Sequence, residues 1–436
     1  MRMRDVIVCM IFLVLAVAAG LAAFNEWGEE DRPDFEYLDM VPLSTFGDPD
    51  AVSGCCEVVT YLGEPYVRMT DVGEIHVVKG SKVTSYVVGR AHLDLFLYTG
   101  QSNSQYYTDP DYYPYQSPLR PGTAFFLGTE TVTASDNYKE DSMMARPSTL
   151  DVSAFTDFTA PDGTVRLSQV YPTFLYDYCE ATGHKALVVN SGYGGRGIGS
   201  WASMNGLASL WTIDVLERTT ELADGKADLE PIGVLFSQGE SDADQTVDYY
   251  ERYLAQAVGH FCDGDYGVAF PKVFSVLPTH YRYQAPTNPA IAQESYASQD
   301  PRFVVASTLP AVLPGSVLER PDDSDRIHYN QTVFNWIGEA FARTVAADAG
   351  YEPARETLVY IADLGEVEEL PETVTAVGTS GAGLTVAVSW TGAGTEPGTY
   401  EATGTPDVPY GYEAAAGLTA RAILVVPAAS EEETSD

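Results

Sequence analysis

Five short apolar runs recur along the middle of the chain and read as β-strands. They are rich in Val, Leu and Phe and lie at residues 93–98, 186–190, 231–237, 272–278 and 302–308. Apolar side chains occupy most positions of each run rather than every second one, which is typical of strands that are covered on both faces. The pattern therefore predicts a parallel sheet that is buried between two layers.

Longer segments with helical periodicity lie between or after these runs. They predict helices over residues 168–183, 207–225, 246–261 and 331–350, and Gly183, Gly225 and Gly350 stand where helix C-caps belong. Because strands alternate with helices, we expect a three-layer α/β domain, which we place at residues 91–350. In such folds ligands bind at the carboxyl ends of the strands.

The sequence on either side of this domain has a different pattern. Residues 25–90 start as an acidic, Pro-containing arm, to about residue 55, and continue as a small β element with a turn at "VKGSKV". Residues 358–428 are rich in Gly, Thr and Val with short alternating runs, which predicts an all-β sandwich. The acidic residues 429–436 are expected to be a disordered tail.

The N-terminus has the features of a targeting segment. Arg2 and Arg4 precede an uncharged apolar stretch at residues 6–24, and acidic residues follow it. This arrangement describes a secretory signal peptide, and the length also suits an uncleaved membrane anchor. We therefore expect residues 1–24 to be one of the two, and the protein to be secreted or extracellular and membrane-anchored, with membrane attachment only through this segment.

The charge balance excludes one class of partner. The chain has 62 acidic and 24 basic residues, a net charge of −38, which repels nucleic-acid phosphates. Outside the apolar stretch the cysteines are Cys55, Cys56, Cys179 and Cys262, and their spacing fits no zinc pattern. We expect no metal, no cofactor and no nucleic-acid partner; an oxidising compartment would permit disulfides, and buried free thiols are the simpler interpretation.

Polar or Gly-rich segments follow three of the predicted strands at their carboxyl ends. They are "GQSNS" (100–104), "SGYGGRGIGSW" (191–201) and "FSQGESDAD" (236–244). A fourth segment, "DDSDRIHYN", places Asp325 three residues before His328 and just before the last predicted helix. Each could be an ordinary turn. Their shared placement favours a site in which Ser102 is a nucleophile, since a catalytic serine needs a base, an orienting acid and oxyanion donors.

The order and spacing of these segments resemble those of the SGNH-hydrolase superfamily, in particular its sialate O-acetylesterase and acetylxylan esterase group. The matches are Gly100-Gln101-Ser102-Asn103, Gly194-Gly195 with Ile198 and Trp201, Gln238-Gly239-Glu240-Ser241, "IAQESY" (291–296), and Asp325 with His328. The resemblance covers about residues 93–345. It implies a three-layer, flavodoxin-like α/β domain with a parallel sheet.

The resemblance also implies roles for the matched residues. Ser102 would attack the ester, His328 would act as the base, and Asp325 would orient His328, with Glu240 as the alternative acid. The oxyanion and substrate would be held by the Ser102 N–H and by Gly194, Gly195, Gln238, Gln101, Asn103 and Glu240. Arg196, beside the glycines, could contact substrate or form a surface salt bridge.

We therefore expect a secreted serine esterase that hydrolyses O-acetyl esters on a glycan of the sialic acid or xylan type. The Tyr-rich insert at residues 106–165 begins at the nucleophile and is expected to shape the substrate pocket. A lipase or broader acylhydrolase is the alternative enzyme, and a non-catalytic glycan-binding or adhesion protein is the alternative of another class. An ordinary α/β-hydrolase is disfavoured because its Gly-x-Ser-x-Gly motif needs Gly at position 104, which is Ser.

The C-terminal β segment resembles a bacterial Ig-like domain of group 4. The resemblance is carried by "LPETVTA", "VSWTG" and "EPGTYEATGT". It implies a spacer or adhesive role without catalytic residues.

Overall fold

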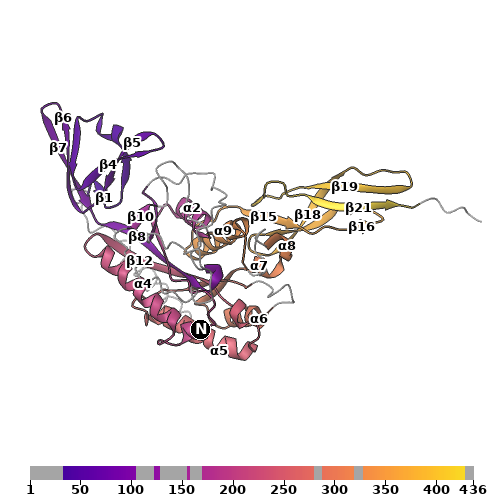
Figure 1. Cartoon of the computed structure of the whole chain (residues 1–436). Coiled ribbons are helices and arrows are strands. Elements are labelled where there is room, and N and C mark those ends of the chain that lie inside the picture. The colour runs from indigo at the N-terminus through magenta and orange to yellow at the C-terminus, as the bar shows by residue number, and fades with distance from the viewer. Residues whose placement is uncertain are drawn as a thin grey trace, which may run out of the picture. The chain divides into compact units, whose positions relative to one another are not determined.

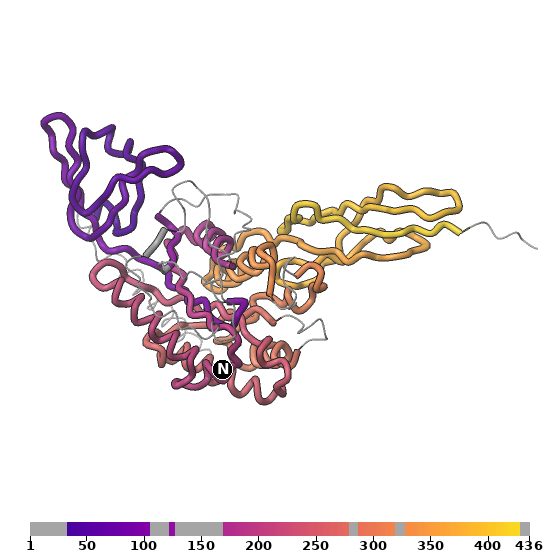
Figure 2. The backbone as a smooth tube through the Cα atoms, in the orientation of Figure 1, coloured from indigo at the N-terminus to yellow at the C-terminus, as the bar shows by residue number. Residues whose placement is uncertain are grey.

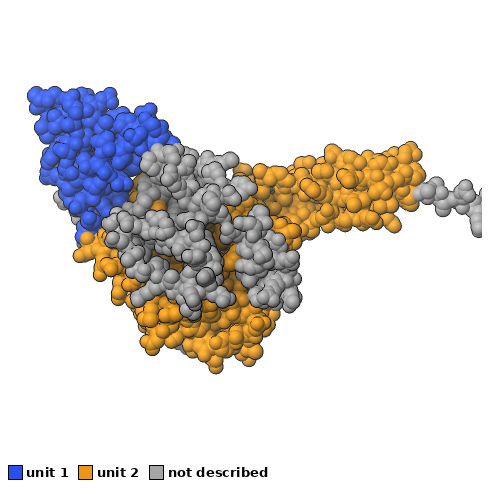
Figure 3. Space-filling view, in the orientation of Figure 1, with its two compact units in different colours: residues 1–91, 225–227 blue, residues 92–224, 228–436 orange. Residues whose placement is uncertain are grey.

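A computed structural model of the chain describes residues 33–104, 122–127, 155–157, 169–278, 287–318 and 328–427. The expected signal or anchor segment, most of the Tyr-rich insert, Asp325 and the acidic tail lie outside these residues. The chain divides into two compact units, one of residues 1–91 with 225–227 and one of residues 92–224 with 228–436 (Figure 3). No helix among the described residues is both long and apolar enough to cross a membrane.

The first unit consists of two small β-sheets. One has the strand order β1-β7-β6-β3 and the other the order β2-β5-β4. The strands are β1 (Phe35–Glu36), β2 (Met40–Pro42), β3 (Ala51–Gly54), β4 (Cys56–Tyr61), β5 (Glu64–Met69), β6 (Gly73–Lys79) and β7 (Lys82–Gly89). Strands β6 and β7 form an antiparallel hairpin whose last pair is Lys79 and Lys82, so the turn at "VKGSKV" is confirmed.

The β structure of this unit begins earlier than the sequence suggested. The prediction of an irregular arm to about residue 55 was wrong, because β1, β2 and β3 all precede it. Phe35, Val41 and Val52 are partly buried against a core that contains Val67 and Ile75. Acidic residues between these apolar positions hid the strands in the sequence.

The second unit contains a seven-stranded sheet in the order β10-β9-β11-β8-β12-β13-β14. The five predicted strands are confirmed as β8 (Ala91–Gly100), β11 (Ala186–Asn190), β12 (Ala227–Ser237), β13 (Val273–Val276) and β14 (Phe303–Ser307). Two further strands, β9 (Ala124–Leu127) and β10 (Phe155–Asp157), extend one edge, and β10 is antiparallel to β9. Strand β8 runs parallel to β11, and β12, β13 and β14 run parallel to one another.

Strands β8 and β12 are neighbours in the middle of this sheet. The Ala91 N–H donates to the Lys226 carbonyl at one end and the Gln101 N–H donates to the Ser237 carbonyl at the other, so the two strands run in the same direction. The five predicted strands are thus ordered second, first, third, fourth, fifth, which is the flavodoxin-like order. The strand order reverses between β8 and β12, and ligands of such sheets bind outside the carboxyl ends at that point.

Helices cover both faces of the sheet (Figures 1 and 2). Helices α2 (Tyr171–Thr182) and α9 (Gln331–Asp348) pack against one face, and α3 (Gly199–Ala202), α4 (Leu207–Ala223) and α5 (Val247–Asp263) lie on the other. The short helices α6 (Asn288–Ala297), α7 (Leu309–Val312) and α8 (Gly315–Leu318) lie near the β14 edge. The four predicted helices and the three-layer α/β architecture are confirmed.

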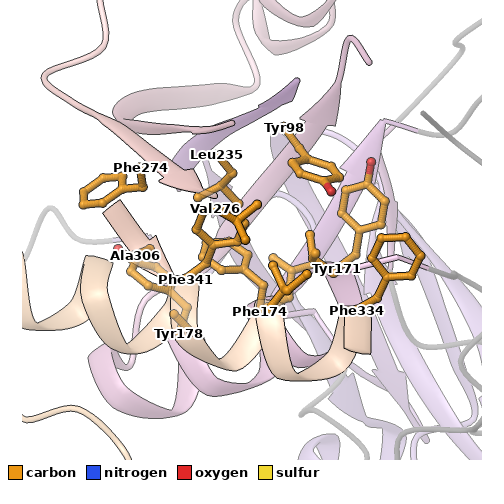
Figure 4. Packing of buried hydrophobic residues seen from close by; sticks show 14 of the residues in the cluster. Tyr98, Tyr171, Phe174, Tyr178, Leu235, Phe274, Val276, Ala306, Phe334 and Phe341 are labelled. Atoms are coloured by element: carbon orange, nitrogen blue, oxygen red, sulfur yellow. The ribbon is translucent and has the colours of Figure 1, made fainter. Parts of the chain in front are cut away.

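Alternation along the strands explains the two layers. Tyr98 and Leu235 lie in the core shared with α2 and α9, where Phe174 and Phe341 also pack (Figure 4). The next residue, Phe236, points to the opposite face and contacts the rings of Trp201 and Phe261. Successive side chains of a strand point to opposite faces, so both faces must be apolar in a sheet covered on both sides.

The C-terminal part of this unit is a β-sandwich, as predicted. Its strands are β15 (Glu356–Ile361), β16 (Glu366–Val367), β17 (Thr373–Gly378), β18 (Gly383–Thr391), β19 (Gly398–Pro406), β20 (Tyr412–Ala414) and β21 (Ala420–Val426). The first half of β18 pairs with β17 and its second half pairs with β19, so β18 joins the two layers. Leu358, Val374, Ala376, Val386 and Ala420 form the core.

Candidate active site

Ser102 lies in a tight turn directly after β8. Gly100 precedes it with a φ of 133°, and a Cβ at this position would overlap the Ser237 carbonyl of β12. Only glycine therefore allows the two strand ends to approach so closely. Ser102–Ser104 then form a 3-10 turn, η2, in which both the N–H and the hydroxyl of Ser104 donate to the Gln101 carbonyl, at 2.8 and 2.7 Å.

Gln101 fixes this turn to the end of β12. Its N–H donates to the Ser237 carbonyl at 2.9 Å, and its side-chain Oε1 accepts from the Ser241 N–H at 2.9 Å. The side chain is buried. Gln101 thus holds the segment of Ser102 against the segment that carries Gln238 and Glu240.

Asn103 connects the serine turn to the histidine segment. Its Nδ2 donates to Glu240 Oε1 at 2.9 Å, and its Oδ1 accepts from the Tyr329 N–H at 3.3 Å. Tyr329 also donates its hydroxyl to Glu240 Oε1, at 3.2 Å. The residue after Ser102 is therefore hydrogen-bonded to the residue after His328, so these two candidates lie in neighbouring segments.

The residues after His328 are fixed by the start of α9. Asn330 is the N-cap, and its Oδ1 accepts from the Val333 N–H at 3.1 Å. Its Nδ2 donates to the carbonyl of Val317, a residue of α8, at 2.7 Å. An N-cap side chain satisfies a helix donor that has no other partner, so the end of the histidine segment has a defined position.

Glu240 is a fully buried carboxylate beside His328. Burial is the main cause that raises its pKa, while the hydrogen bonds from Asn103 and Tyr329 and the charge of His328 lower it. Both donors contact Oε1, and Oε2 has no hydrogen-bond partner among the described residues. A buried carboxylate with one unused oxygen close to a histidine can stabilise the imidazolium form of that histidine.

Gln238 is the centre of a second hydrogen-bond network. Its Nε2 donates to Asp242 Oδ2 at 2.6 Å and to the Arg196 carbonyl at 3.2 Å, and it lies 3.4 Å from Gln101 Oε1. Its Oε1 accepts from the Tyr250 hydroxyl at 2.5 Å. The side chain is fully buried and is oriented by partners from three segments.

The Gly-rich segment after β11 is fixed at both ends. The Tyr193 N–H donates to the Gly100 carbonyl at 2.8 Å, and the Ile198 N–H donates to Asp242 Oδ2 at 2.7 Å. Between these bonds Gly194 is buried, whereas Gly195 is exposed and has a φ of 67°, a conformation that favours glycine. The segment that carries both predicted oxyanion glycines therefore lies beside the end of β8.

The structure thus brings together the predicted residues of the first three segments and His328. Asp325 lies outside the described residues. Tyr329, Tyr250 and Asp242 are important partners that sequence reasoning did not select. Signals exist for two of them: Tyr329 follows His328 directly, and Asp242 comes two residues after Glu240 in the same polar segment.

The site has the chemical groups for acyl transfer. It combines a hydroxyl at a strand end, a nearby imidazole, a buried carboxylate and a cluster of backbone and amide N–H groups. Among the residues that the structure describes, no group of three or more His, Cys, Asp or Glu side chains could hold a metal ion. These groups lie at the point where the strand order reverses, as expected for a ligand site of this fold.

Comparison with known families identifies one part of the chain. Residues 354–412 match the family described as bacterial Ig-like domain (group 4), in agreement with the observed β-sandwich. The match covers only the C-terminal part, so it assigns no family to the α/β domain. A search of curated proteins found no matching relative.

Three solved structures align with the chain at low similarity. A protein from Arabidopsis thaliana is 15% identical, covers 58% of this chain and 98% of its own, and has a TM-score of 0.38. A carbohydrate acetylesterase from Xanthomonas citri is 15% identical. The alignment covers 84% of this chain and 82% of the acetylesterase, with a TM-score of 0.35. The protein NanS is 14% identical. The alignment covers 61% of this chain and 99% of NanS, with a TM-score of 0.39.

Proposed function

We propose that the α/β domain is a serine esterase that removes O-acetyl groups from a glycan. The observation that carries the proposal is the position of Asn103, which is hydrogen-bonded both to Tyr329 next to His328 and to Glu240. This arrangement holds the segments of a nucleophile, a base and a carboxylate together at the strand-order reversal. A structural turn would not require it.

In the proposed mechanism Ser102 Oγ attacks the acetyl carbonyl carbon while His328 accepts the hydroxyl proton. The tetrahedral intermediate collapses, the sugar oxygen leaves, and His328 returns the proton to it. A water molecule, activated by His328, then attacks the acetyl-Ser102 ester and releases acetate. Asp325 is proposed to orient His328, with Glu240 stabilising the positive charge that develops on the ring.

The oxyanion is proposed to be held by the N–H groups of Ser102 and of Gly194 or Gly195, together with Gln238. In the structure Gln238 Nε2 already donates to Asp242 and to the Arg196 carbonyl. Its part in the oxyanion hole therefore requires that the substrate oxygen replaces one of these acceptors. No described group accepts from these backbone donors, so they need no such exchange and are proposed to carry the larger share of the stabilisation.

The test is acetate release from 4-nitrophenyl acetate, acetylated xylan and O-acetylated sialic acid, with the wild type and Ser102→Ala. We expect the wild type to release acetate from at least one glycan. The rate of Ser102→Ala should be lower by a factor of about a thousand or more. A wild type that releases no acetate from any of the three contradicts the proposal. A wild type active only on lipid-like esters would support the acylhydrolase alternative instead.

We propose in addition that the protein is exported. The support is the sequence of residues 1–24, with two arginines before an uncharged apolar stretch. Mass spectrometry of the N-terminal peptide, from culture medium and from membranes, tests the proposal. A cleaved N-terminus in the medium indicates a signal peptide, an intact one in membranes indicates an anchor, and an intact one confined to the cytosol contradicts export.

A further inference from the structure

Arg196 is a cation beside the candidate site for which the described part of the chain supplies no acceptor. Its guanidinium carbon lies 5.3 Å from the centre of the Tyr193 ring. Its Nε is buried and has no hydrogen-bond partner among the described residues, and no described acidic residue forms an ion pair with Arg196. A partly buried charged group without an acceptor is costly, so an acceptor supplied by a ligand to the guanidinium would stabilise it.

This finding separates the two roles that the sequence left open for Arg196. A surface salt bridge would be easy to form in a chain with 62 acidic and 24 basic residues. No such bridge is formed by the described residues. Contact with a substrate is the other role that the sequence offered.

The position of Arg196 is set by the site itself. Its carbonyl accepts from Gln238 Nε2 at 3.2 Å. Tyr193, under the guanidinium, donates its N–H to the Gly100 carbonyl, two residues before Ser102. Ile198, two residues later, is bonded to Asp242. The arginine therefore stands on a segment that is fixed to both strand ends that carry the candidate catalytic groups.

The chemistry of a guanidinium that lies over an aromatic ring indicates its ligand. The contact with Tyr193 leaves the N–H groups that point away from the ring for hydrogen bonds. Those N–H groups match the two oxygens of a carboxylate. The acid excess of the whole chain repels anions at long range, so an anionic substrate requires a local cation of this kind.

We propose that Arg196 binds a carboxylate of the substrate, so that the preferred substrate is an O-acetylated sugar acid rather than a neutral sugar. This inference rests on the esterase function proposed above. Arg196 selects the substrate and takes no part in the acyl transfer. It would contact the sugar that carries the ester while Ser102 attacks the acetyl group.

The experiment compares two substrates that differ only in the carboxylate: methyl glucuronoside and methyl glucoside, acetylated at the same position. The wild type is expected to prefer the glucuronoside, mainly through a lower KM. In Arg196→Gln the ratio of the two kcat/KM values should fall by roughly tenfold to hundredfold, as for loss of a charge-assisted hydrogen-bonded pair. Arg196→Lys keeps the positive charge but lacks the paired N–H groups of a guanidinium. In this variant the ratio of the two kcat/KM values should fall by less than in Arg196→Gln.

Arg218→Gln is the matched control, because Arg218 is an exposed residue of α4 and forms an ion pair with Glu221. This variant removes one positive charge from a residue that is not part of the candidate site, and it should leave the ratio as in the wild type. Competitive inhibition of the wild type by glucuronate, but not by glucose, is a second readout that needs no variant. It should weaken as the salt concentration rises.

The outcomes separate this inference from the proposed function. If the wild type cleaves 4-nitrophenyl acetate but shows no preference for the glucuronoside and no inhibition by glucuronate, the inference is overturned and the esterase proposal stands. If the wild type cleaves none of the esters, the esterase proposal itself fails. A ratio that falls equally in Arg218→Gln would assign the effect to net charge and would also overturn the role of Arg196.

Discussion

Single residues hold this site together because their side chains contact more than one segment. Asn103 contacts Glu240 and Tyr329, and Asp242 contacts Gln238 and the Ile198 N–H. Removing one such side chain leaves buried donors or acceptors without partners on several segments at once. Its effect on activity should therefore exceed that of removing one isolated hydrogen bond.

Substitution of Asp242 tests the effect of such a multiply bonded side chain without changing the proposed nucleophile or base. Its Oδ2 alone accepts both hydrogen bonds, so the carbonyl oxygen of an asparagine can replace it. We expect the kcat of Asp242→Asn to stay within about fivefold of the wild-type value. The kcat of Asp242→Ala should fall roughly tenfold to hundredfold, because each unpaired donor costs about 1–3 kcal/mol. Equal losses in both variants would instead assign the effect to the charge.

The two candidate acids are distinguished by Glu240→Gln and Asp325→Asn. Loss of the acid that orients a catalytic histidine costs about ten-thousandfold in kcat, whereas loss of a supporting carboxylate costs less. We expect Asp325→Asn to show the larger loss and Glu240→Gln a loss of roughly tenfold to hundredfold, measured on 4-nitrophenyl acetate. The reverse order would transfer the orienting role to Glu240.

At the scale of elements, the close approach of β8 and β12 is what places Ser102. Gly100→Ala adds a Cβ against the Ser237 carbonyl, which can be accommodated only if the strand ends separate. We expect a loss of several kcal/mol in the free energy of unfolding, or no folded protein, together with loss of activity. The measurement is chemical denaturation followed by circular dichroism.

Gly183→Ala is the control for backbone strain alone. Gly183 caps α2 with a φ of 73°, and an added Cβ there would meet no atom within 4 Å. Gly183→Ala should lower the free energy of unfolding by only about 1–2 kcal/mol and leave kcat unchanged. If Gly100→Ala costs no more than Gly183→Ala, the close packing of the two strand ends is not what constrains the turn.

The elements that the sequence predicted are those with a strong and regular pattern. Strands β8, β11, β12, β13 and β14 are apolar on both faces, and α2, α4, α5 and α9 are long enough to show periodicity. The edge strands β9 and β10 were missed because they are three or four residues long and lie within an insert of mixed composition. Such strands form by pairing with an existing edge rather than by their own pattern.

The residues of the candidate site could be selected from the sequence, but the hydrogen bonds between its distant segments could not. Ser102, Gln238 and Glu240 were visible as polar residues at strand ends. The link from Asn103 to Tyr329 joins residues that are 226 positions apart, and no local pattern encodes it. The absence of an acidic partner for Arg196 among the described residues likewise became visible only in three dimensions.

At the scale of the whole molecule, the Ig-like domain is hydrogen-bonded to the last helix of the α/β domain. Glu339 of α9 accepts from the Thr357 N–H at 2.8 Å and from the Thr379 hydroxyl at 2.9 Å. The Ser307 hydroxyl at the end of β14 donates to the Thr379 carbonyl at 2.7 Å. Val359 of β15 is part of the core beneath α9. These contacts are those of a docked domain rather than of a free spacer.

This junction has a predictable pH dependence. Burial raises the pKa of Glu339 above its ordinary value of 4.5, although its hydrogen bonds oppose the rise. Below pH 4.5 the carboxyl is protonated in both the folded and the unfolded chain. As the pH rises, the unfolded chain ionises first, so the folded state loses stability until Glu339 itself ionises. The loss lies above pH 4.5.

Glu339→Gln removes this ionisation and keeps an oxygen that accepts both hydrogen bonds. We therefore expect its free energy of unfolding, relative to the wild type, to increase between about pH 4.5 and neutral pH, measured by denaturation at several pH values. Glu221→Gln, at an exposed position on α4, should change stability by less than about 0.5 kcal/mol at each pH. A Glu339→Gln difference that does not change with pH, or that decreases, would contradict the account.

The central claim, that Ser102 is an activated nucleophile, is tested most directly by covalent labelling. A fluorophosphonate that reacts with catalytic serines is incubated with the wild type, Ser102→Ala and His328→Ala, and the labelled peptide is identified by mass spectrometry. We predict one labelled residue, Ser102, in the wild type and little or no label in either variant. Labelling of another serine, or equal labelling of wild type and His328→Ala, would contradict it.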